Sequence, residues 1–147
     1  MEVHCGSDHR GYELKRQILE YLESLGHACV DHGCHAGEQA HYPQYGASVG
    51  RAVAAAPGAM GVVVCGSGAG IAIATNKIRG VRCTVAWCEH AAEYGRRHNH
   101  ANVLAFGADL QTFTQVKRCI DAYLNAGEEG GRHEQRVAMI NALDDDP

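Results

Sequence analysis

The sequence predicts an α/β fold of three layers, with helices on both faces of a five-stranded parallel sheet and one more helix at the C-terminus. Short apolar runs alternate with segments whose apolar residues recur at helical spacing. No linker or internal repeat divides the 147 residues, a length that suits one domain. Since strands that alternate with helices pair in parallel, we expect residues 1–147 to form a single α/β/α sandwich.

Five short apolar runs are expected to form the strands. They span residues 3–5, 27–31, 60–65, 82–87 and 103–106. The run at residues 60–65 is the most apolar of the five. A strand without polar alternation is typical of a parallel sheet covered on both faces, so this run is expected at the centre.

The segments between these runs carry the helix signals. Leu14, Ile18 and Leu22 share one helical face, and Gly26 stands where a C-terminal cap would be. Pro43 suits the first turn of a second helix, and Thr112 is expected to cap a later one. Further helices are expected over residues 69–76, 89–97, 113–123 and 132–143, and the acidic tail 144–147 is expected to fray.

Composition excludes several classes of function. With 13 basic and 17 acidic residues, the net charge of −4 offers no basic excess for nucleic acid. No apolar run approaches the ~20 residues that cross a bilayer, and the N-terminus lacks the layout of a signal peptide. The seven cysteines show no regular spacing. We therefore expect a reduced, cytoplasmic protein without nucleic-acid or membrane partners.

Ligands of parallel α/β sheets bind beyond the carboxyl ends of the strands. This rule directs attention to residues 6–11, 65–70, 87–90 and 107–109. The strongest signal is the segment from Cys65 to Gly70, which has three glycines and joins the central strand to a helix. Its amide groups can bind an anion. Ile71 breaks the dinucleotide, Walker and thiol-phosphatase patterns, so none of these nucleotide or phosphate loops applies.

Cys65 can be read in two ways. At a helix N-terminus its thiolate is favoured by the helix dipole and by amide hydrogen bonds, which suits a nucleophile or a base. Equally, it can be a small apolar residue that closes a buried strand, the commoner fate of cysteine. Position alone leaves the two alternatives balanced.

Other polar residues also have a functional and a structural interpretation. Asp8 and His9 follow the first strand and can bind hydroxyl or phosphate groups, although Asp8 can also cap the next helix. Arg132 and Arg136 are four residues apart on one helical face and suit a phosphate monoester, unless they are plain solvated surface. One of the imidazoles of His98 and His100 can transfer protons, or a histidine there can simply cap the helix end or lie in solvent.

A cluster of cysteines and histidines between residues 29 and 41 raises the alternative of a zinc site. The cluster has the wrong spacing for a structural zinc knuckle, and no Cys-x2-Cys pair occurs elsewhere in the chain. We therefore expect no metal. The five residues are Cys29, His32, Cys34, His35 and His41.

Several motifs in register resemble the type B ribose-5-phosphate isomerases, a family shared with the galactose-6-phosphate isomerases. The resemblance extends from residue 3 to about residue 143. The motifs are Gly6-Ser7-Asp8-His9, Tyr42-Pro43, Cys65-Gly66-Ser67-Gly68 with Asn76-Lys77, His98-Asn99, Asn102-Val103-Leu104 and Gly130-Gly131-Arg132-His133.

The resemblance implies a Rossmann-like domain that forms a homodimer with shared active sites, pairing further into a tetramer in some cases. It implies interconversion of ribose 5-phosphate and ribulose 5-phosphate through an enediolate, a step of the pentose phosphate pathway that needs no cofactor. Cys65 would be the base, and His98 and Asn99 would come from the partner subunit. The implied catalytic residues are Cys65, Ser67, His98 and Asp8; the implied substrate-binding residues are His9, Tyr42, Gly66, Gly68, Gly70, Asn99, Arg132 and Arg136.

Three positions depart from the pattern of the family. Arg10 replaces a small residue, and His41 stands where an aspartate often precedes Tyr-Pro. Asp109 stands where many relatives carry a phosphate-binding arginine, and a carboxylate there would repel a phosphate dianion unless it points away. Ile71 occupies the place of a glutamate that is the base in a second branch, so no carboxylate competes with Cys65.

Three alternatives stay open at this stage. The sugar phosphate can have six carbons, such as galactose or allose 6-phosphate, because sequence does not report the depth of a pocket. The domain can be a flavodoxin-like module that binds phosphate or a nucleotide without catalysis, and its ligand binding would survive Cys65→Ala. It can also be a redox-sensing or zinc-dependent protein that uses its seven thiols.

Overall fold

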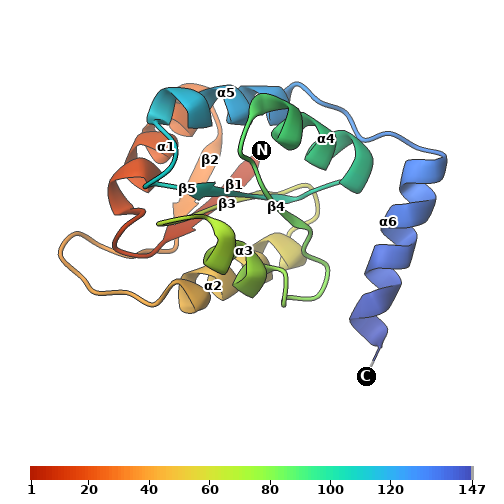
Figure 1. Ribbon diagram of the computed structural model, residues 1–147, viewed down its shortest axis with the longest axis horizontal. Helices are drawn as coiled ribbons and strands as arrows, with labels where there is room; N and C mark the ends of the chain where they lie inside the picture. The colour runs from red at the N-terminus through yellow and green to blue at the C-terminus, as the bar shows by residue number, and fades with distance from the viewer. Residues whose placement is uncertain (147) are drawn as a thin grey trace.

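The computed structural model describes residues 1–146 and has five parallel strands in one sheet. The strands are β1 (Glu2–Ser7), β2 (Ala28–Asp31), β3 (Met60–Cys65), β4 (Cys83–Val85) and β5 (Val103–Gly107). Their order across the sheet is β2-β1-β3-β5-β4, so β3 lies at the centre as the sequence predicts. Figure 1 shows the sheet between two layers of helices.

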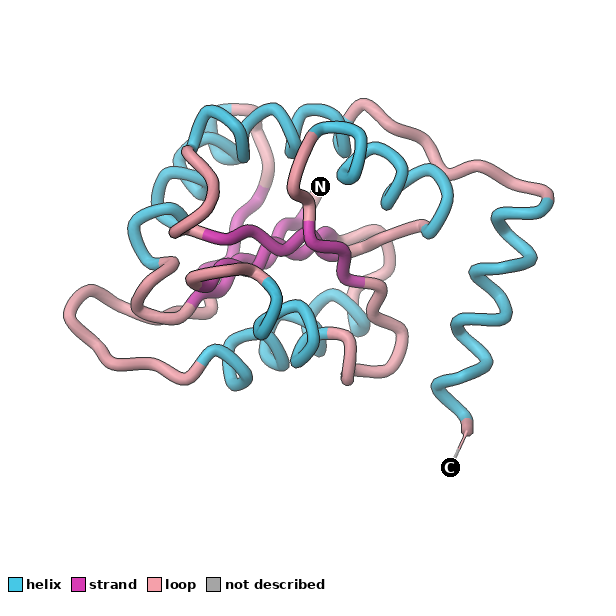
Figure 2. The backbone as a smooth tube through the Cα atoms, in the orientation of Figure 1, coloured by secondary structure: helices cyan, strands magenta, loops and turns pink. Residues whose placement is uncertain are grey.

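Five helices form the outer layers of the sandwich. The upper layer in Figure 1 consists of α1 (Tyr12–Ser24), α4 (Glu89–Asn99) and α5 (Phe113–Leu124). The lower layer consists of α2 (Tyr42–Ala55) and α3 (Ala69–Thr75). Figure 2 shows the same alternation of strand and helix along the backbone. The predicted α/β/α sandwich is therefore confirmed.

Alternate residues of the strands supply the two halves of the core. Val62 and Val64 pack with the apolar faces of α1, α4 and α5, whereas Val63 and Cys65 pack with those of α2 and α3. Every residue of β3 is buried because helices cover both of its faces. This double burial is the physical reason why the sequence of β3 lacks polar alternation.

Most of the expected helix ends are confirmed. The Thr112 hydroxyl accepts a hydrogen bond from the Gln115 amide, and the Gln115 side-chain oxygen accepts one from the Thr112 amide, which completes a capping box. Pro43 lies in the first turn of α2. Gly26 has a φ of +85°, the left-handed conformation in which a glycine ends a helix most readily.

The chain differs from the prediction at β4 and at the acidic tail. The strand β4 is shorter than expected, because it is an edge strand that pairs only with β5. The tail is not frayed where the structure describes it, so that prediction is wrong for residues 144–146. Leu143–Asp145 form a 3-10 turn, in which Asp144 accepts from the Gly80 amide at 2.8 Å and Asp145 pairs with Arg79. Residue 147 lies outside the described residues.

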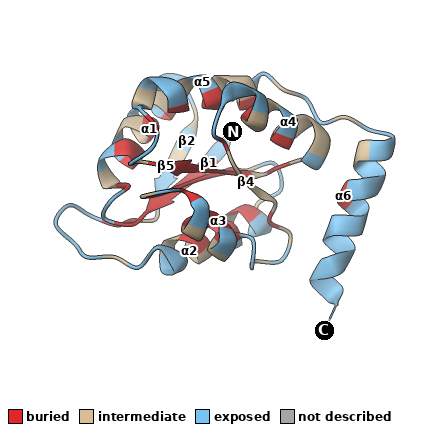
Figure 3. Ribbon diagram, viewed as in Figure 1, coloured by how far each residue is buried: buried red, intermediate tan, exposed pale blue. Residues whose placement is uncertain are grey.

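The last helix, α6 (Arg132–Ala142), stands beside the sandwich and packs mainly on α4. Figure 3 shows it almost wholly exposed, and Val137 is its one buried residue. The side chains of Met139 and Leu143 are 70% and 65% exposed. No described helix is both long and apolar enough to span a membrane.

Candidate active site

Three loops meet at one edge of the sheet because their strands are neighbours. Ser7 of β1 pairs with Val64 of β3, and Cys65 of β3 pairs with Gly107 of β5. All three strands therefore end at nearly the same height, and the segments that follow them lie side by side. The strand order also reverses between β1 and β3, the position at which α/β sheets bind their ligands.

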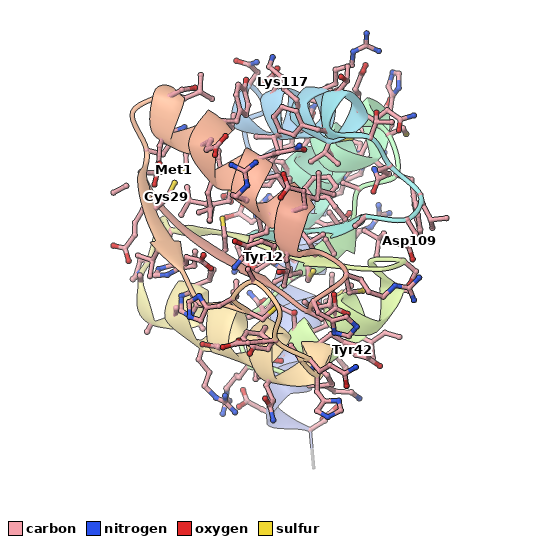
Figure 4. The ribbon with its side chains drawn as sticks, turned by 90° about the vertical axis from the view of Figure 1, so that its left-hand side faces the viewer. Met1, Tyr12, Cys29, Tyr42, Asp109 and Lys117 are labelled. Atoms are coloured by element: carbon pink, nitrogen blue, oxygen red, sulfur yellow. The ribbon has the colours of Figure 1, made fainter. Side chains whose placement is uncertain are left out.

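A cavity of about 330 Å³ lies where these loops meet. Figure 4 shows Tyr42 and Asp109 on the same side of the molecule, and both contribute to the cavity wall. Six predicted site residues line it, together with Arg10, Asp109 and Leu110. The six are Asp8, Tyr42, Cys65, Gly66, Ser67 and Gly70.

Cys65 ends the central strand and is only 4% exposed. The Gly68 amide donates a hydrogen bond to its Sγ at 3.2 Å. A hydrogen bond donated to sulfur stabilises negative charge on that atom. The thiol therefore has both the access to a cavity and the amide donor that the sequence predicts.

Five of the other cysteines are poor nucleophiles. Burial raises the pKa of Cys119 to about 11 and that of Cys83 to about 12. Burial is also the main cause that raises the pKa of the Cys5, Cys29 and Cys34 thiols. A thiol must ionise to react, so these five contribute little chemistry near neutral pH.

The glycines of the loop after β3 are required by close contacts. Gly68 has a φ of +80°, and a Cβ there would lie 2.9 Å from the backbone carbonyl carbon of Phe106. A Cβ at Gly70 would lie 2.7 Å from the ring of Tyr42. The Ser67 hydroxyl accepts from the Ala69 amide at 3.3 Å and is exposed to the cavity. Side chains at either glycine would displace the loop that presents Cys65.

Asp8 closes the turn that precedes α1 and does not cap the helix, because Gly11 is the N-cap residue and no described side chain caps it. Its Oδ1 accepts from the Gly11 amide at 3.0 Å, and the residue is 6% exposed. A Cβ on Gly11 would lie 2.6 Å from the Val64 carbonyl oxygen, so this turn packs directly on β3. Asp8 also lines the cavity.

His9 lies outside the cavity wall. The residue is exposed, and its Nδ1 lies 3.3 Å from the Ala40 carbonyl oxygen. The structure therefore leaves its predicted contact with substrate untested.

The remaining predicted site residues lie at the other end of β5. His98 and Asn99 end α4, just before β5 begins, and Arg132 and Arg136 are exposed on α6. None of the four lines the cavity around Cys65. The chain by itself does not bring these four residues to the cavity around Cys65.

His98 is part of an aromatic stack. Its ring lies parallel to that of His133 at 4.2 Å and nearly parallel to that of Tyr94 at 4.9 Å. Glu129 lies 3.8 Å from Nε2 of His98 and 3.5 Å from Nε2 of His133. Hydrogen bonds from Arg97 lower the pKa of Glu129, while burial first and the neighbouring His98 second lower the pKa of His133.

His98, Glu129 and His133 are the one group of potential metal ligands that gathers within residues 1–146. The two imidazole rings are parallel within 9°, so the lone pairs of their Nε2 atoms do not converge on one point. A zinc ion needs ligand atoms that converge tetrahedrally. The cysteines and histidines between residues 29 and 41 do not assemble into such a group in the same described part of the chain.

Two other cavities lie apart from Cys65. Residues 87–90, which the sequence places at the same edge, line a separate cavity of about 260 Å³ beside Arg118 and Cys119. A larger cavity of about 540 Å³ lies where α6 leaves the sandwich. Its charges are largely paired, because Arg96 contacts Glu128 at 2.7 Å and Arg79 pairs with Asp145.

Sequence reasoning did not include Arg10, Asp109 and Leu110 among the site residues. Arg10 and Asp109 were noted only as departures from a pattern, yet both line the cavity and form an ion pair with each other. Their positions directly after β1 and β5 were the signal that placed them at this edge. Nothing in the linear sequence indicates that they pair.

The fold and the cavity together define an α/β protein with a cavity beside Cys65 at the carboxyl ends of its strands. The model of the Ribose/Galactose Isomerase family matches residues 3–140. The chain belongs to this family, and it is an isomerase.

Relatives of known name cover nearly the whole chain. Ribose-5-phosphate isomerase B of Escherichia coli is 41% identical over 97% of this chain and 96% of its own length. A galactose-6-phosphate isomerase subunit, LacB of Clostridium acetobutylicum, is 31% identical over 99% of this chain and 83% of its own.

Solved structures agree with this assignment. Ribose-5-phosphate isomerase B of Clostridium thermocellum superposes with a TM-score of 0.95 at 38% identity, over 99% of this chain and 98% of that one. Ribose-5-phosphate isomerase B of Mycoplasma genitalium with bound ribulose-5-phosphate superposes with a TM-score of 0.94 at 30% identity, over 99% of this chain and 97% of that one.

Proposed function

We propose that this isomerase interconverts ribose 5-phosphate and ribulose 5-phosphate, with Cys65 as the base. The observation that carries the proposal is the position of the Cys65 sulfur. It lies at the wall of the cavity where the strand order reverses, and it accepts a hydrogen bond from the Gly68 amide. The names of the relatives support a five-carbon substrate over a six-carbon one, and the ribulose-5-phosphate complex of one relative supports it further.

The reaction moves two protons within the open-chain sugar, one from C2 to C1 and one from the oxygen on C2 to the oxygen on C1. The Cys65 thiolate takes the proton from C2, the electrons of that C–H bond form the C1–C2 double bond of an enediolate, and the π electrons of the C1 carbonyl move to its oxygen. The thiol then returns the proton to C1, while the hydroxyl on C2 loses its proton and becomes the carbonyl and the oxygen on C1 gains one. Nothing is oxidised or reduced outside the substrate, so the step itself requires no redox partner.

The neighbouring groups suit the charge that develops on the enediolate. Amides of residues 66–70 would stabilise its oxygens, as an oxyanion hole does, and the Ser67 hydroxyl would carry the proton between them. Asp8, fixed by its bond to the Gly11 amide, would accept from sugar hydroxyls. Tyr42 packs on Gly70 and closes one wall of the cavity.

We also propose a homodimer in which each active site uses both chains. His98 would open the furanose ring and Asn99 would bind the sugar, both from the partner, while Arg132, Arg136 and His9 would hold the phosphate. The support is that neither His98 nor Arg132 lines the cavity of its own chain, and that α6 exposes apolar side chains. Interfaces between two identical chains are commonly symmetric.

A cytoplasmic location and a role in the pentose phosphate pathway complete the proposal. All seven cysteines are free thiols, as is typical of a reducing compartment.

The direct test follows ketose formation from ribose 5-phosphate in the presence of a chelator. Wild type should convert the substrate, and Cys65→Ala should not. Cys88→Ala is the matched control, because Cys88 is exposed and lies outside the cavity. Turnover by Cys65→Ala equal to wild type would refute the role of the thiol.

The same assay separates the competing functions. A phosphate-binding module would bind the sugar phosphate without turnover in any variant. A metal-dependent protein would lose activity in chelator, and a hexose-phosphate isomerase would prefer galactose 6-phosphate or allose 6-phosphate over the pentose.

Shared sites are tested by mixing two inactive variants. Cys65→Ala and His98→Ala, unfolded and refolded together, should regain part of the activity because some mixed dimers carry one intact site. No recovery from the mixture would contradict the shared site. Arg132→Ala should mainly raise KM, since it would hold a remote group in ground and transition states alike.

A further inference from the structure

An ion pair lies directly over the glycine loop of the active site. The Arg10 guanidinium donates from Nη2 to Oδ2 of Asp109, although the two residues are 99 positions apart. A Cβ on Gly66 would lie 2.9 Å from Oδ2 of Asp109 and 3.1 Å from Cζ of Arg10. Both charged groups therefore rest on the backbone next to Cys65, at the wall of the cavity.

The charges around the cavity make Arg10 important for an anionic substrate. Within the described residues that line the cavity, Arg10 is the only cation, while Asp8 and Asp109 are carboxylates. A sugar phosphate brings further negative charge to this wall. Coulomb repulsion from an unpaired carboxylate would weaken its binding, so the guanidinium has to neutralise Asp109.

The guanidinium also has donors to spare. It carries five N–H groups in a plane, and only the bond from Nη2 to Asp109 is formed within residues 1–146. The Arg10 side chain is 59% exposed, so its other donors are accessible. A planar set of charged donors matches the oxygens of a phosphoryl group better than it matches neutral hydroxyls.

The backbone on both sides of the pair is fixed. The Asp109 amide donates to the Gly66 carbonyl oxygen at 3.0 Å, and the Gly11 amide next to Arg10 donates to Asp8. Because both ends are held, Asp109 can keep the long arginine side chain over the cavity before a ligand arrives. Such preorganisation reduces the entropy that is lost on binding.

We propose that Arg10 binds the phosphoryl group of the substrate from the same chain as Cys65, and that Asp109 is a positioning residue that aims it. This inference rests on the proposed isomerase function. It adds a cation to the arginines of α6, and it gives the carboxylate at position 109 a role other than repulsion.

The experiment measures KM for ribose 5-phosphate and the inhibition constant of inorganic phosphate. The key comparison is between Asp109→Asn and the double variant that also carries Arg10→Ala. In this background the loss of Arg10 does not leave an unpaired carboxylate at position 109 that would itself repel the substrate. Loss of a charge-assisted hydrogen bond should raise both constants about tenfold or more, with a smaller change in kcat. Arg16→Ala is the matched control, since it removes another exposed, ion-paired arginine on α1.

A second comparison isolates the positioning role of Asp109. Asparagine can still accept the hydrogen bond from Arg10, whereas alanine cannot, and both remove the charge. Asp109→Ala should therefore have a higher KM than Asp109→Asn when Arg10 is present. In the Arg10→Ala background, the two variants should have equal KM values.

The outcomes separate this inference from the proposed function. If wild type turns over ribose 5-phosphate, but loss of Arg10 changes neither KM nor the inhibition constant of phosphate, the proposed role of Arg10 is wrong and the isomerase function stands. A raised KM with unchanged phosphate inhibition would also overturn it, because Arg10 would then contact another part of the sugar. No turnover by wild type would overturn the isomerase function and this inference together.

Discussion

Gly68→Ala is the substitution that most directly tests how the loop presents Cys65. Gly68 has a φ of +80°, and alanine in this region costs about 1–2 kcal/mol. Its Cβ would also lie 2.9 Å from the carbonyl carbon of Phe106, in the backbone of a buried strand that cannot easily move. Overpacking of this kind costs about 1–3 kcal/mol. The free energy of unfolding should therefore fall by about 2–5 kcal/mol, out of a typical total of about 5–15 kcal/mol.

Gly58→Ala is the matched control for the conformational part of this cost. Gly58 has a φ of +85°, and a Cβ there would meet nothing within 4 Å. It should lose only the about 1–2 kcal/mol that belongs to the left-handed conformation. Urea unfolding of the two variants therefore isolates the contact with Phe106.

Activity tests the second role of Gly68. Displacement of its amide removes the 3.2 Å hydrogen bond to the Cys65 sulfur. A hydrogen bond to a charged group contributes about 1.5–3 kcal/mol, so kcat should fall by about 10- to 150-fold in the folded variant. Wild-type kcat in Gly68→Ala, or stability equal to that of Gly58→Ala, would refute this account of the loop.

Three further predictions concern thiols, a buried ion pair and pH. Iodoacetamide near neutral pH should modify Cys65 and exposed Cys88 before the other cysteines, as measured by peptide mass spectrometry, and ribose 5-phosphate should protect only Cys65. Asp31→Asn should lower the free energy of unfolding in urea more than Lys15→Met does. The Lys15 side chain is 1% exposed and would lose its charged partner at 2.6 Å, keeping the uncharged Cys34 carbonyl oxygen, whereas the Asp31 side chain is 39% exposed. Burial, and next the charge of a neighbouring histidine, lower the pKa of His32 below 6.5. The contribution of neutral His32 to stability is therefore complete above about pH 6.5 and is lost as the pH falls from there through the lower pKa of the folded state. The urea concentration at the unfolding midpoint should fall over this pH range in wild type, and it should fall less in His32→Gln.

Local signals were sufficient for most of the fold. The apolar run at residues 60–65 requires burial on both faces, and the sheet provides it. Thr112 caps its helix because the hydroxyl and the Gln115 side chain act over three residues. Local signals are insufficient where contacts between residues far apart in the sequence determine the structure. The acidic tail is ordered by Gly80, a residue 64 positions away, and the short β4 follows from its place at the edge of the sheet.

The candidate site divides in the same way. Rules about strand ends placed Asp8, Cys65 and Ser67 at one edge, and the cavity confirms that they share a wall. The pairing of Arg10 with Asp109 could not be predicted, because the sequence shows Arg10 only as the replacement of a small residue and Asp109 only as a charge that would repel phosphate. Their charges compensate only when β1, β3 and β5 bring the two loops together.

The length of β5 limits what one chain can do. His98 precedes this strand and the cavity follows it, and the five residues of β5 extend about 16 Å at about 3.3 Å per residue. An imidazole side chain spans less than half of that distance, and His98 is already stacked between Tyr94 and His133. No rotation of its side chain can bring it to the cavity of its own chain. If His98 takes part in the reaction at Cys65, it must therefore do so in the site of a second copy, and the recovery of activity in mixed dimers becomes a necessary consequence of its catalytic role.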